Sequence, residues 1–124
     1  MHPTINIRFY SYPTCSTCRK AIAWLQARNI AFKLIDIVST PPSREILEKA
    51  LPQLEKRKLL FNTNGVSYRN LGAIKVHNMT DEQALDALSS DGKLIKRPFL
   101  IVNECFILTG FNIDKWTEFF DKLE

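Results

Sequence analysis

The hydrophobic period changes twice in the first third of the chain. Residues 5–10 alternate apolar and polar side chains and are rich in β-branched and aromatic types, which predicts a strand. From residue 18 to residue 28 the apolar positions follow a helical spacing, and Asn29 is placed to end that helix. Residues 31–37 return to a strand pattern. Residues 5–37 therefore predict a β-α-β unit whose two strands run parallel.

The middle of the chain predicts short helices. Residues 40–43 read Thr-Pro-Pro-Ser, and prolines or a hydroxyl in the first turn are typical of a helix start. Residues 53–60 predict a second short helix, whereas residues 66–78 show no clean period and are expected to be irregular. Thr80 and Gln83 stand three positions apart, which is the spacing of a capping box and predicts a further helix.

The last part of the chain predicts a hairpin and a helix. Residues 99–102 are a short apolar run typical of a buried strand, and residues 105–108 are its expected partner. Asn103 and Glu104 form the expected two-residue turn between them. The final helix has one apolar stripe, made of Ile113, Trp116, Phe119, Phe120 and Leu123.

The predicted order is β-α-β, a helical middle, then α-β-β-α. This order indicates an α/β protein with a mixed sheet and helices on its faces. Residues 1–124 are expected to form one domain, with the helical segment of about residues 40–90 as an insertion within it.

Composition excludes several classes of protein. The 45% hydrophobic and 24% charged fractions are those of a globular chain, and no apolar run approaches the roughly 18 residues of a membrane span. Seventeen basic and thirteen acidic side chains give a net charge of +4, which is weak for a nucleic-acid binder. The first residues lack the pattern of a secretory signal, so a cytoplasmic protein without membrane or direct nucleic-acid partners is expected.

The strongest chemical signal is Cys15-Ser16-Thr17-Cys18, a C-x-x-C pair between a strand and a helix. A helix amino terminus favours a thiolate, which is the nucleophile of disulfide exchange. Cys15 is therefore the expected nucleophile, and Cys18 is close enough in sequence to resolve a mixed disulfide. Neighbouring hydroxyls and a cation are expected to support the pair: Thr14, Ser16, Thr17 and Arg19.

Two alternatives to redox chemistry remain for this pair. A structural zinc site needs four ligands, and beyond the pair the chain offers Cys105, His77 and His2 without a second paired motif, so no metal is predicted. An inert reduced pair is the other alternative. The apolar neighbours of Cys105 favour a buried position for it.

A second candidate element precedes the predicted hairpin. Pro98 stands at the first residue of a strand, where proline is tolerated. If the bond from Arg97 to Pro98 is cis, the turn lies at the sheet end where the cysteines also emerge, and Arg97 directs its guanidinium toward Cys15. The alternative is an exposed arginine before a structural proline.

These motifs together resemble the ArsC/Spx family of the thioredoxin-like superfamily. The resemblance is carried by residues 12–21, 95–98 and 108–111, and it extends over nearly the whole chain. It implies a thioredoxin-like fold, with Cys15 as the reactive cysteine and Cys18 as the second cysteine of a redox switch. It also implies that Arg97 is the arginine before the family's cis-proline, which is Pro98 here.

The family holds arsenate reductases, Spx and MgsR regulators and small thiol reductases of the YffB type. The resemblance implies a thiol–disulfide oxidoreductase without a bound cofactor, which takes electrons from glutathione, thioredoxin or glutaredoxin. The alternative is a redox-switched regulator that binds RNA polymerase through its alpha subunit. Arsenate reduction is disfavoured, because Asn62 and Gly110 stand where similar arsenate reductases have two further arginines; Arg19, Arg69 or Lys96 are the candidate replacements.

Overall fold

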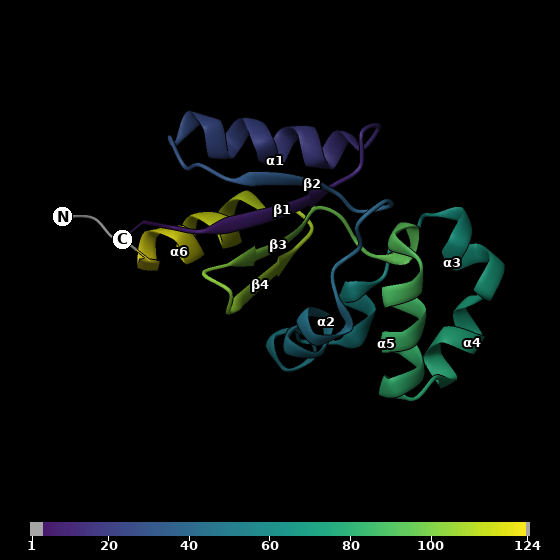
Figure 1. The fold of residues 1–124 in the computed structure, drawn as a ribbon. Helices are drawn as coiled ribbons and strands as arrows, with labels where there is room; N and C mark the ends of the chain where they lie inside the picture. The colour runs from purple at the N-terminus through teal and green to yellow at the C-terminus, as the bar shows by residue number, and fades with distance from the viewer. Residues whose placement is uncertain (1–3, 124) are drawn as a thin grey trace.

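The computed structural model describes residues 4–123 and contains a four-stranded mixed sheet. The strands lie in the order β2-β1-β3-β4, with β1 parallel to β2 and antiparallel to β3, and with β3 antiparallel to β4 (Figure 1). Their bounds are Ile7–Ser11 for β1, Lys33–Asp36 for β2, Phe99–Val102 for β3 and Phe106–Thr109 for β4. The parallel β-α-β unit and the mixed sheet predicted from the sequence are confirmed.

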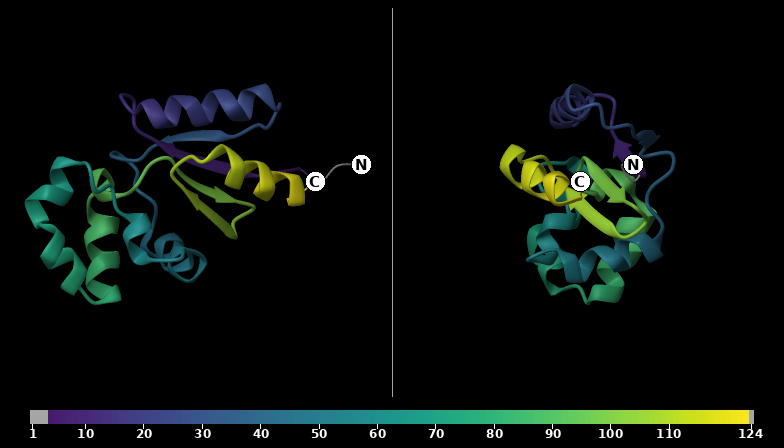
Figure 2. Two further views of the ribbon diagram at one scale, coloured as in Figure 1. Left: turned by 180° about the vertical axis from the view of Figure 1, so that it is seen from behind. Right: turned by 90° about the vertical axis from the view of Figure 1, so that its left-hand side faces the viewer.

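One face of the sheet is covered by two helices from opposite ends of the chain. They are α1, Ser16–Ala27, and α6, Ile113–Leu123, and both lie on the same side of the sheet in Figure 2. Phe9 of β1 and Leu100 of β3 are fully buried against Leu25 of α1 and Phe120 of α6. These aromatic and aliphatic contacts hold α1 against the strand that precedes it.

The other face packs on the helical middle of the chain. Tyr10 and Phe99 face this second cluster, because side chains alternate between the two faces of a strand. All four residues of β3 are buried, since the strand is covered on both faces. The middle segment comprises α2 (Arg44–Ala50), α3 (Val66–Leu71), α4 (Ala73–Asn78) and α5 (Asp81–Ser90), with three short 3-10 turns: η1 (Leu51–Gln53), η2 (Arg57–Leu60) and η3 (Gly92–Leu94).

Local signals set the ends of several helices as predicted. Asn29 adopts a φ of 58° directly after α1, and the Ile30 amide donates to the Leu25 carbonyl at 3.0 Å. The Thr80 hydroxyl accepts from the Gln83 amide at 3.1 Å, and the Gln83 side chain accepts from the Thr80 amide at 3.0 Å. The capping box is therefore complete.

Residues 66–78 are not irregular, which corrects the prediction for this segment. They form α3 and α4, two helices of six residues each, separated by Gly72 with a φ of 88°. The break resets the helical phase, so no single period runs through the segment. Val76 is nevertheless buried in the cluster beneath the sheet, because packing against α5 and the 3-10 turns stabilises helices that are too short to persist alone.

The prediction that Cys105 is buried is also wrong. Val102 pairs with Phe106, so Cys105 belongs to the turn and is exposed rather than starting β4. Asn103 and Glu104 have φ values of 53° and 57°, and the turn is closed by a Cys105 amide that donates to the Val102 carbonyl at 3.1 Å. The apolar run that begins at Cys105 correctly predicted a strand, but the strand begins one residue later, at Phe106.

Ile113 also departs from expectation, because it is 57% exposed although it belongs to the predicted apolar stripe of the last helix. It is the first residue of α6. None of the helices within residues 4–123 has the length and apolar composition that crossing a bilayer requires. The prediction about a secretory signal concerns the start of the chain, and residues 1–3 lie outside the described residues.

Candidate functional site

Cys15 lies at the amino terminus of α1. It follows the turn after β1, which is closed by the Cys15 amide donating to the Tyr12 carbonyl at 3.0 Å. Its extended backbone, with φ −84° and ψ 111°, makes it the N-cap residue of α1. The Cys15 Sγ accepts a hydrogen bond from the Cys18 amide at 3.3 Å, so the sulfur occupies the place of an ordinary capping oxygen. An acceptor in this place gains from the unpaired amides and the positive end of the helix dipole.

Cys18 differs from Cys15 in its environment. Cys15 is half-buried, whereas Cys18 is 1% exposed and packs beneath the first turn of α1. Burial raises the pKa of the Cys18 thiol to about 11, and the hydrogen bond with Cys15 acts in the same direction, against weaker lowering by the Tyr12 backbone and the Ser11 side chain. Both cysteines are free thiols in this structure. The pair thus consists of one accessible sulfur and one that remains protonated at neutral pH.

Arg97 lies opposite this pair. The peptide bond from Arg97 to Pro98 is cis, and Pro98 is buried at the start of β3. The Arg97 guanidinium carbon lies 4.3 Å from the centre of the Tyr12 ring, and its Nη1 is buried without a hydrogen-bond acceptor among the described residues. A stacked guanidinium with an unused donor is suited to receive an anion.

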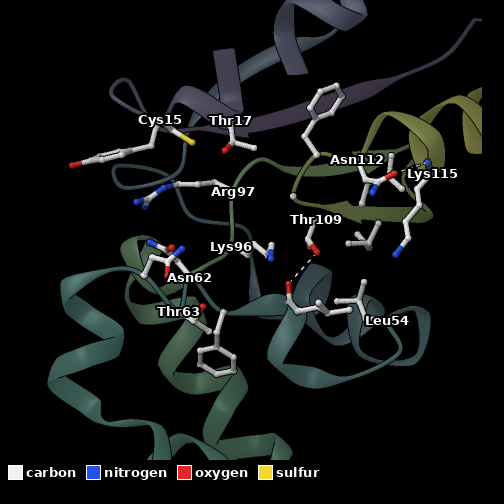
Figure 3. A pocket seen from close by; sticks show the side chains of 18 of the residues that line it. Cys15, Thr17, Leu54, Asn62, Thr63, Lys96, Arg97, Thr109, Asn112 and Lys115 are labelled. Carbon is white, nitrogen blue, oxygen red and sulfur yellow. Dashed lines mark hydrogen bonds between the residues drawn. The ribbon is translucent and has the colours of Figure 1, made fainter. Parts of the chain in front are cut away.

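The strand register explains why Arg97 and Cys15 meet. Tyr10 near the end of β1 pairs with Phe99 at the start of β3, and Phe99 pairs with Thr109 at the end of β4. The segments that follow β1, precede β3 and follow β4 therefore all emerge at one end of the sheet. Cys15 and Arg97 both line a cavity of about 820 Å³ at this end (Figure 3).

The supporting residues expected from the sequence divide between this cavity and its surroundings. Thr14, Ser16 and Thr17 line the cavity together with Cys15, whereas Arg19 is exposed on α1 and does not. The Arg19 amide donates to the Cys15 carbonyl at 3.2 Å.

The structure also shows which of the positions that could carry further cations lie at the cavity. Asn62 and Gly110 both line the cavity, so the structure brings these two positions to Arg97 as the resemblance implied. Lys96 is a lining residue as well. Arg69 is not, and its side chain is directed to the Asn64 carbonyl at 3.4 Å. Lys96 is therefore the one of the three candidate replacements that reaches the cavity.

Sequence reasoning missed the contribution of α6. Asn112, Lys115 and Trp116 line the cavity, and the Asn112 side chain accepts from the Lys115 amide at 3.0 Å. Asn112 three positions before Lys115 is a helix N-cap pattern, so the start of this helix could have been located from the sequence. The position of this first turn near Cys15 depends on the β3–β4 hairpin, so it could not have been predicted from the sequence.

Among residues 4–123, no cluster of three or more His, Cys, Asp or Glu side chains is close enough together to hold a metal ion. His77 is exposed in α4. His2, the other histidine considered for zinc, lies outside the described residues.

With this geometry established, the comparisons define the class of protein. Residues 10–119 match the ArsC family, and the chain belongs to that family. A crystal structure of a possible arsenate reductase from Streptococcus mutans UA159 has a TM-score of 0.83 and 36% identity, with 90% of this chain and 97% of that chain covered. The thioredoxin-like α/β fold expected from the resemblance is confirmed.

Two curated relatives are similar along most of their length. The chain is 41% identical over 118 residues to the uncharacterized protein YusI of Bacillus subtilis, covering 92% of this chain and 98% of YusI. It is 33% identical over 108 residues to the regulatory protein MgsR of the same organism, covering 86% of this chain and 84% of MgsR. The family is thus shared with proteins named as enzymes and as regulators.

Proposed function

We propose that this protein is a thiol–disulfide oxidoreductase in which Cys15 attacks the substrate and Cys18 resolves the mixed disulfide. The observation that carries the proposal is the asymmetry of the pair. The Cys15 sulfur lies on a cavity wall and accepts the Cys18 amide at 3.3 Å, whereas Cys18 is 1% exposed behind it. Only Cys15 is accessible to a substrate that enters the cavity.

The proposed reaction proceeds in two exchanges. The Cys15 thiolate attacks one sulfur of a disulfide, a Cys15–substrate S–S bond forms, and the first substrate thiolate leaves and takes a proton from water. Cys18 then forms an S–S bond with Cys15 and passes its proton to the second departing substrate sulfur. Two electrons have moved to the substrate, and a thiol reductant such as glutathione, thioredoxin or glutaredoxin restores the protein dithiol without any bound cofactor.

The raised pKa of Cys18 supports this order of events. A thiol with a pKa of about 11 is almost wholly protonated at neutral pH and is a poor first nucleophile. It becomes effective when a mixed disulfide on Cys15 places a sulfur electrophile beside it. Arg97 contributes the unused guanidinium donor, which stabilises negative charge on the leaving sulfur or elsewhere on the substrate.

The test is to trap the intermediate in a protein that carries Cys105→Ser, because exposed Cys105 would otherwise react with disulfides too. With oxidised glutathione, Cys18→Ser in this background should accumulate one bound glutathione per chain by intact mass. The Cys15→Ser counterpart should accumulate none, and the parent should form an internal disulfide. Glutathione retained by the Cys15→Ser protein would exclude Cys15 as the nucleophile.

A redox-switched regulator is the second candidate, favoured by the 33% identity with MgsR over 84% of that protein's length. In this alternative, oxidation of Cys15 and Cys18 changes a surface that binds the alpha subunit of RNA polymerase. Capture of the purified alpha subunit by one redox state, without turnover of disulfides, would favour this function over the enzyme. No direct contact with nucleic acid is part of either proposal.

Arsenate reduction is the third and weakest candidate. The cavity presents Asn62 and Gly110 rather than two further guanidinium groups beside Arg97, so an arsenate dianion would lose most charge-assisted bonds.

We further propose that the chain acts in the reducing cytoplasm, which keeps such thiols available. We also propose that residues 1–124 form one domain, since the helices of the middle segment share the sheet as a common core.

A further inference from the structure

We infer that Lys96 and Lys115 form a second, anion-binding end of the Cys15 cavity, so that the substrate disulfide is elongated and carries a carboxylate remote from its sulfur. This inference rests on the proposed function and names the chemical class of its substrate. It follows from the cations that line the cavity and from their lack of ion pairs among the described residues.

Positive charge dominates the lining of the cavity. Lys96, Arg97 and Lys115 are its cations, against one carboxylate, that of Glu55. None of these three cations forms an ion pair with a residue between 4 and 123. By contrast, the four arginines Arg8, Arg28, Arg44 and Arg57 are each paired with a carboxylate. The amino termini of α1 and α6 both border the cavity and add to its positive potential.

Gly110 is what admits Lys96 to the cavity. Gly110 has a φ of 68°, and a Cβ at this position would stand 2.9 Å from Lys96 Cε and 3.9 Å from Lys96 Nζ. The lysine chain therefore passes over the bare Cα of Gly110, and any side chain there would displace it. The Lys96 amide is held by the Leu60 carbonyl at 2.8 Å, which anchors the base of this side chain.

Lys115 approaches the same space from the first turn of α6. Its amide is fixed by the Asn112 side chain at 3.0 Å, and the helix itself is anchored by buried Trp116 and Phe120. In Figure 3 the side chain of Lys96 lies between Arg97 and Thr109, and the amine of Lys115 lies on the far side of Thr109 from Cys15 and Arg97. Lys115 thus lies across the cavity from the reacting sulfur, with Lys96 between them.

This separation favours a long substrate over a short one. A small neutral disulfide fills only the end at Cys15, whereas a volume of about 820 Å³ falls within the roughly 300–1,000 Å³ of sites for drug-sized ligands. A peptide-like disulfide with carboxylates at its ends would reach Cys15 with its sulfur and the lysines with one carboxylate. It would also place negative charge near the unpartnered Nη1 of Arg97.

The test compares an anionic with a neutral disulfide in the Cys105→Ser protein. Rate constants for loss of the reduced form are measured with oxidised glutathione and with bis(2-hydroxyethyl) disulfide, by acid quench and intact mass. Combining Lys96→Gln and Lys115→Gln should lower the rate constant with oxidised glutathione about tenfold. The rate with the neutral disulfide should change less than twofold, because the thiol chemistry is untouched.

The matched control is Lys93→Gln with Lys122→Gln, which removes the same charge outside the cavity and should leave both rates within twofold. An equal loss with both disulfides in the Lys96 and Lys115 variant, or no loss with either, would overturn the inference. The proposed function is judged separately, by whether Cys15→Ser abolishes reaction with the neutral disulfide, which does not need the lysines. Failure of one can therefore be told from failure of the other.

Discussion

Tyr12 supports both halves of the site through different atoms. Its ring lies 4.3 Å from the guanidinium carbon of Arg97, and its carbonyl accepts the Cys15 amide at 3.0 Å. The Tyr12 ring therefore stacks on the Arg97 guanidinium, while the Tyr12 backbone closes the turn that positions the Cys15 sulfur. Because the two contacts use different atoms, substitution of the side chain can release Arg97 without removing the turn.

Tyr12→Leu should lower the rate of Cys15 with oxidised glutathione about threefold, since a cation–π contact of this kind contributes roughly 0.5–1 kcal/mol at exposed sites. Tyr12→Phe keeps the aromatic face and should retain nearly the full rate. Both rates are obtained by acid quench and intact mass in the Cys105→Ser protein. Equal rates for the two variants would show that the stacking has no part in the reaction.

The stability of the reduced protein should fall between pH 9 and pH 11 because of Cys18. In the unfolded chain this thiol ionises near its ordinary pKa of 9.0, whereas in the folded protein burial raises the pKa to about 11. Across that window the folded state holds the proton and the unfolded state has lost it, so rising pH favours unfolding, by about 2 kcal/mol at pH 10.5.

The measurement is urea unfolding of the reduced protein at pH 8 and pH 10.5, with Cys18→Ala as the comparison. The variant should lose less stability than the parent over this interval, whatever its stability at pH 8. Burial also raises the pKa of Tyr10. Because Tyr10 is present in both proteins, its contribution cancels in the comparison. An identical loss in both would contradict the assignment to Cys18.

The three thiols should differ in their access to reagents. Cys105 is exposed in the hairpin turn and Cys15 is half-buried at the cavity, so both should react with iodoacetamide in the native protein. Cys18 is 1% exposed and should react only when α1 opens, at least about 100-fold more slowly. Peptide mapping after timed alkylation measures all three, and rapid labelling of Cys18 would be inconsistent with this packing.

Gly92 should tolerate no side chain. A Cβ there would stand 1.8 Å from the Ile37 carbonyl oxygen, and both are fixed backbone positions. Gly92→Ala should therefore destabilise the protein by about 2–4 kcal/mol. Gly65→Ala is the matched control, because its Cβ would meet chiefly the movable Asn62 amide at 2.6 Å. Urea unfolding of both variants should show a much smaller loss for Gly65→Ala.

Most elements could be predicted where the determining signals are local. The alternation before Ser11, the left-handed Asn29 after α1 and the Thr80–Gln83 capping box each depend on residues within one turn or strand. Where a signal depends on distant packing, prediction failed. The helices around Gly72 are too short to show a period, and exposed Cys105 differs from a buried cysteine only through a register one residue later than expected.

The sequence by itself determined where the cysteine pair lies, since a C-x-x-C pair between a strand and a helix places one sulfur at the N-cap of α1 and the other one turn inside. It also determined the buried character of β3. Only the tertiary structure decided what faces Cys15. The sheet order β2-β1-β3-β4 brings the end of β1, the start of β3 and the end of β4 to one edge. Arg97, Lys96 and Lys115 meet there because hydrogen-bonded register, rather than distance along the chain, sets which loops are neighbours.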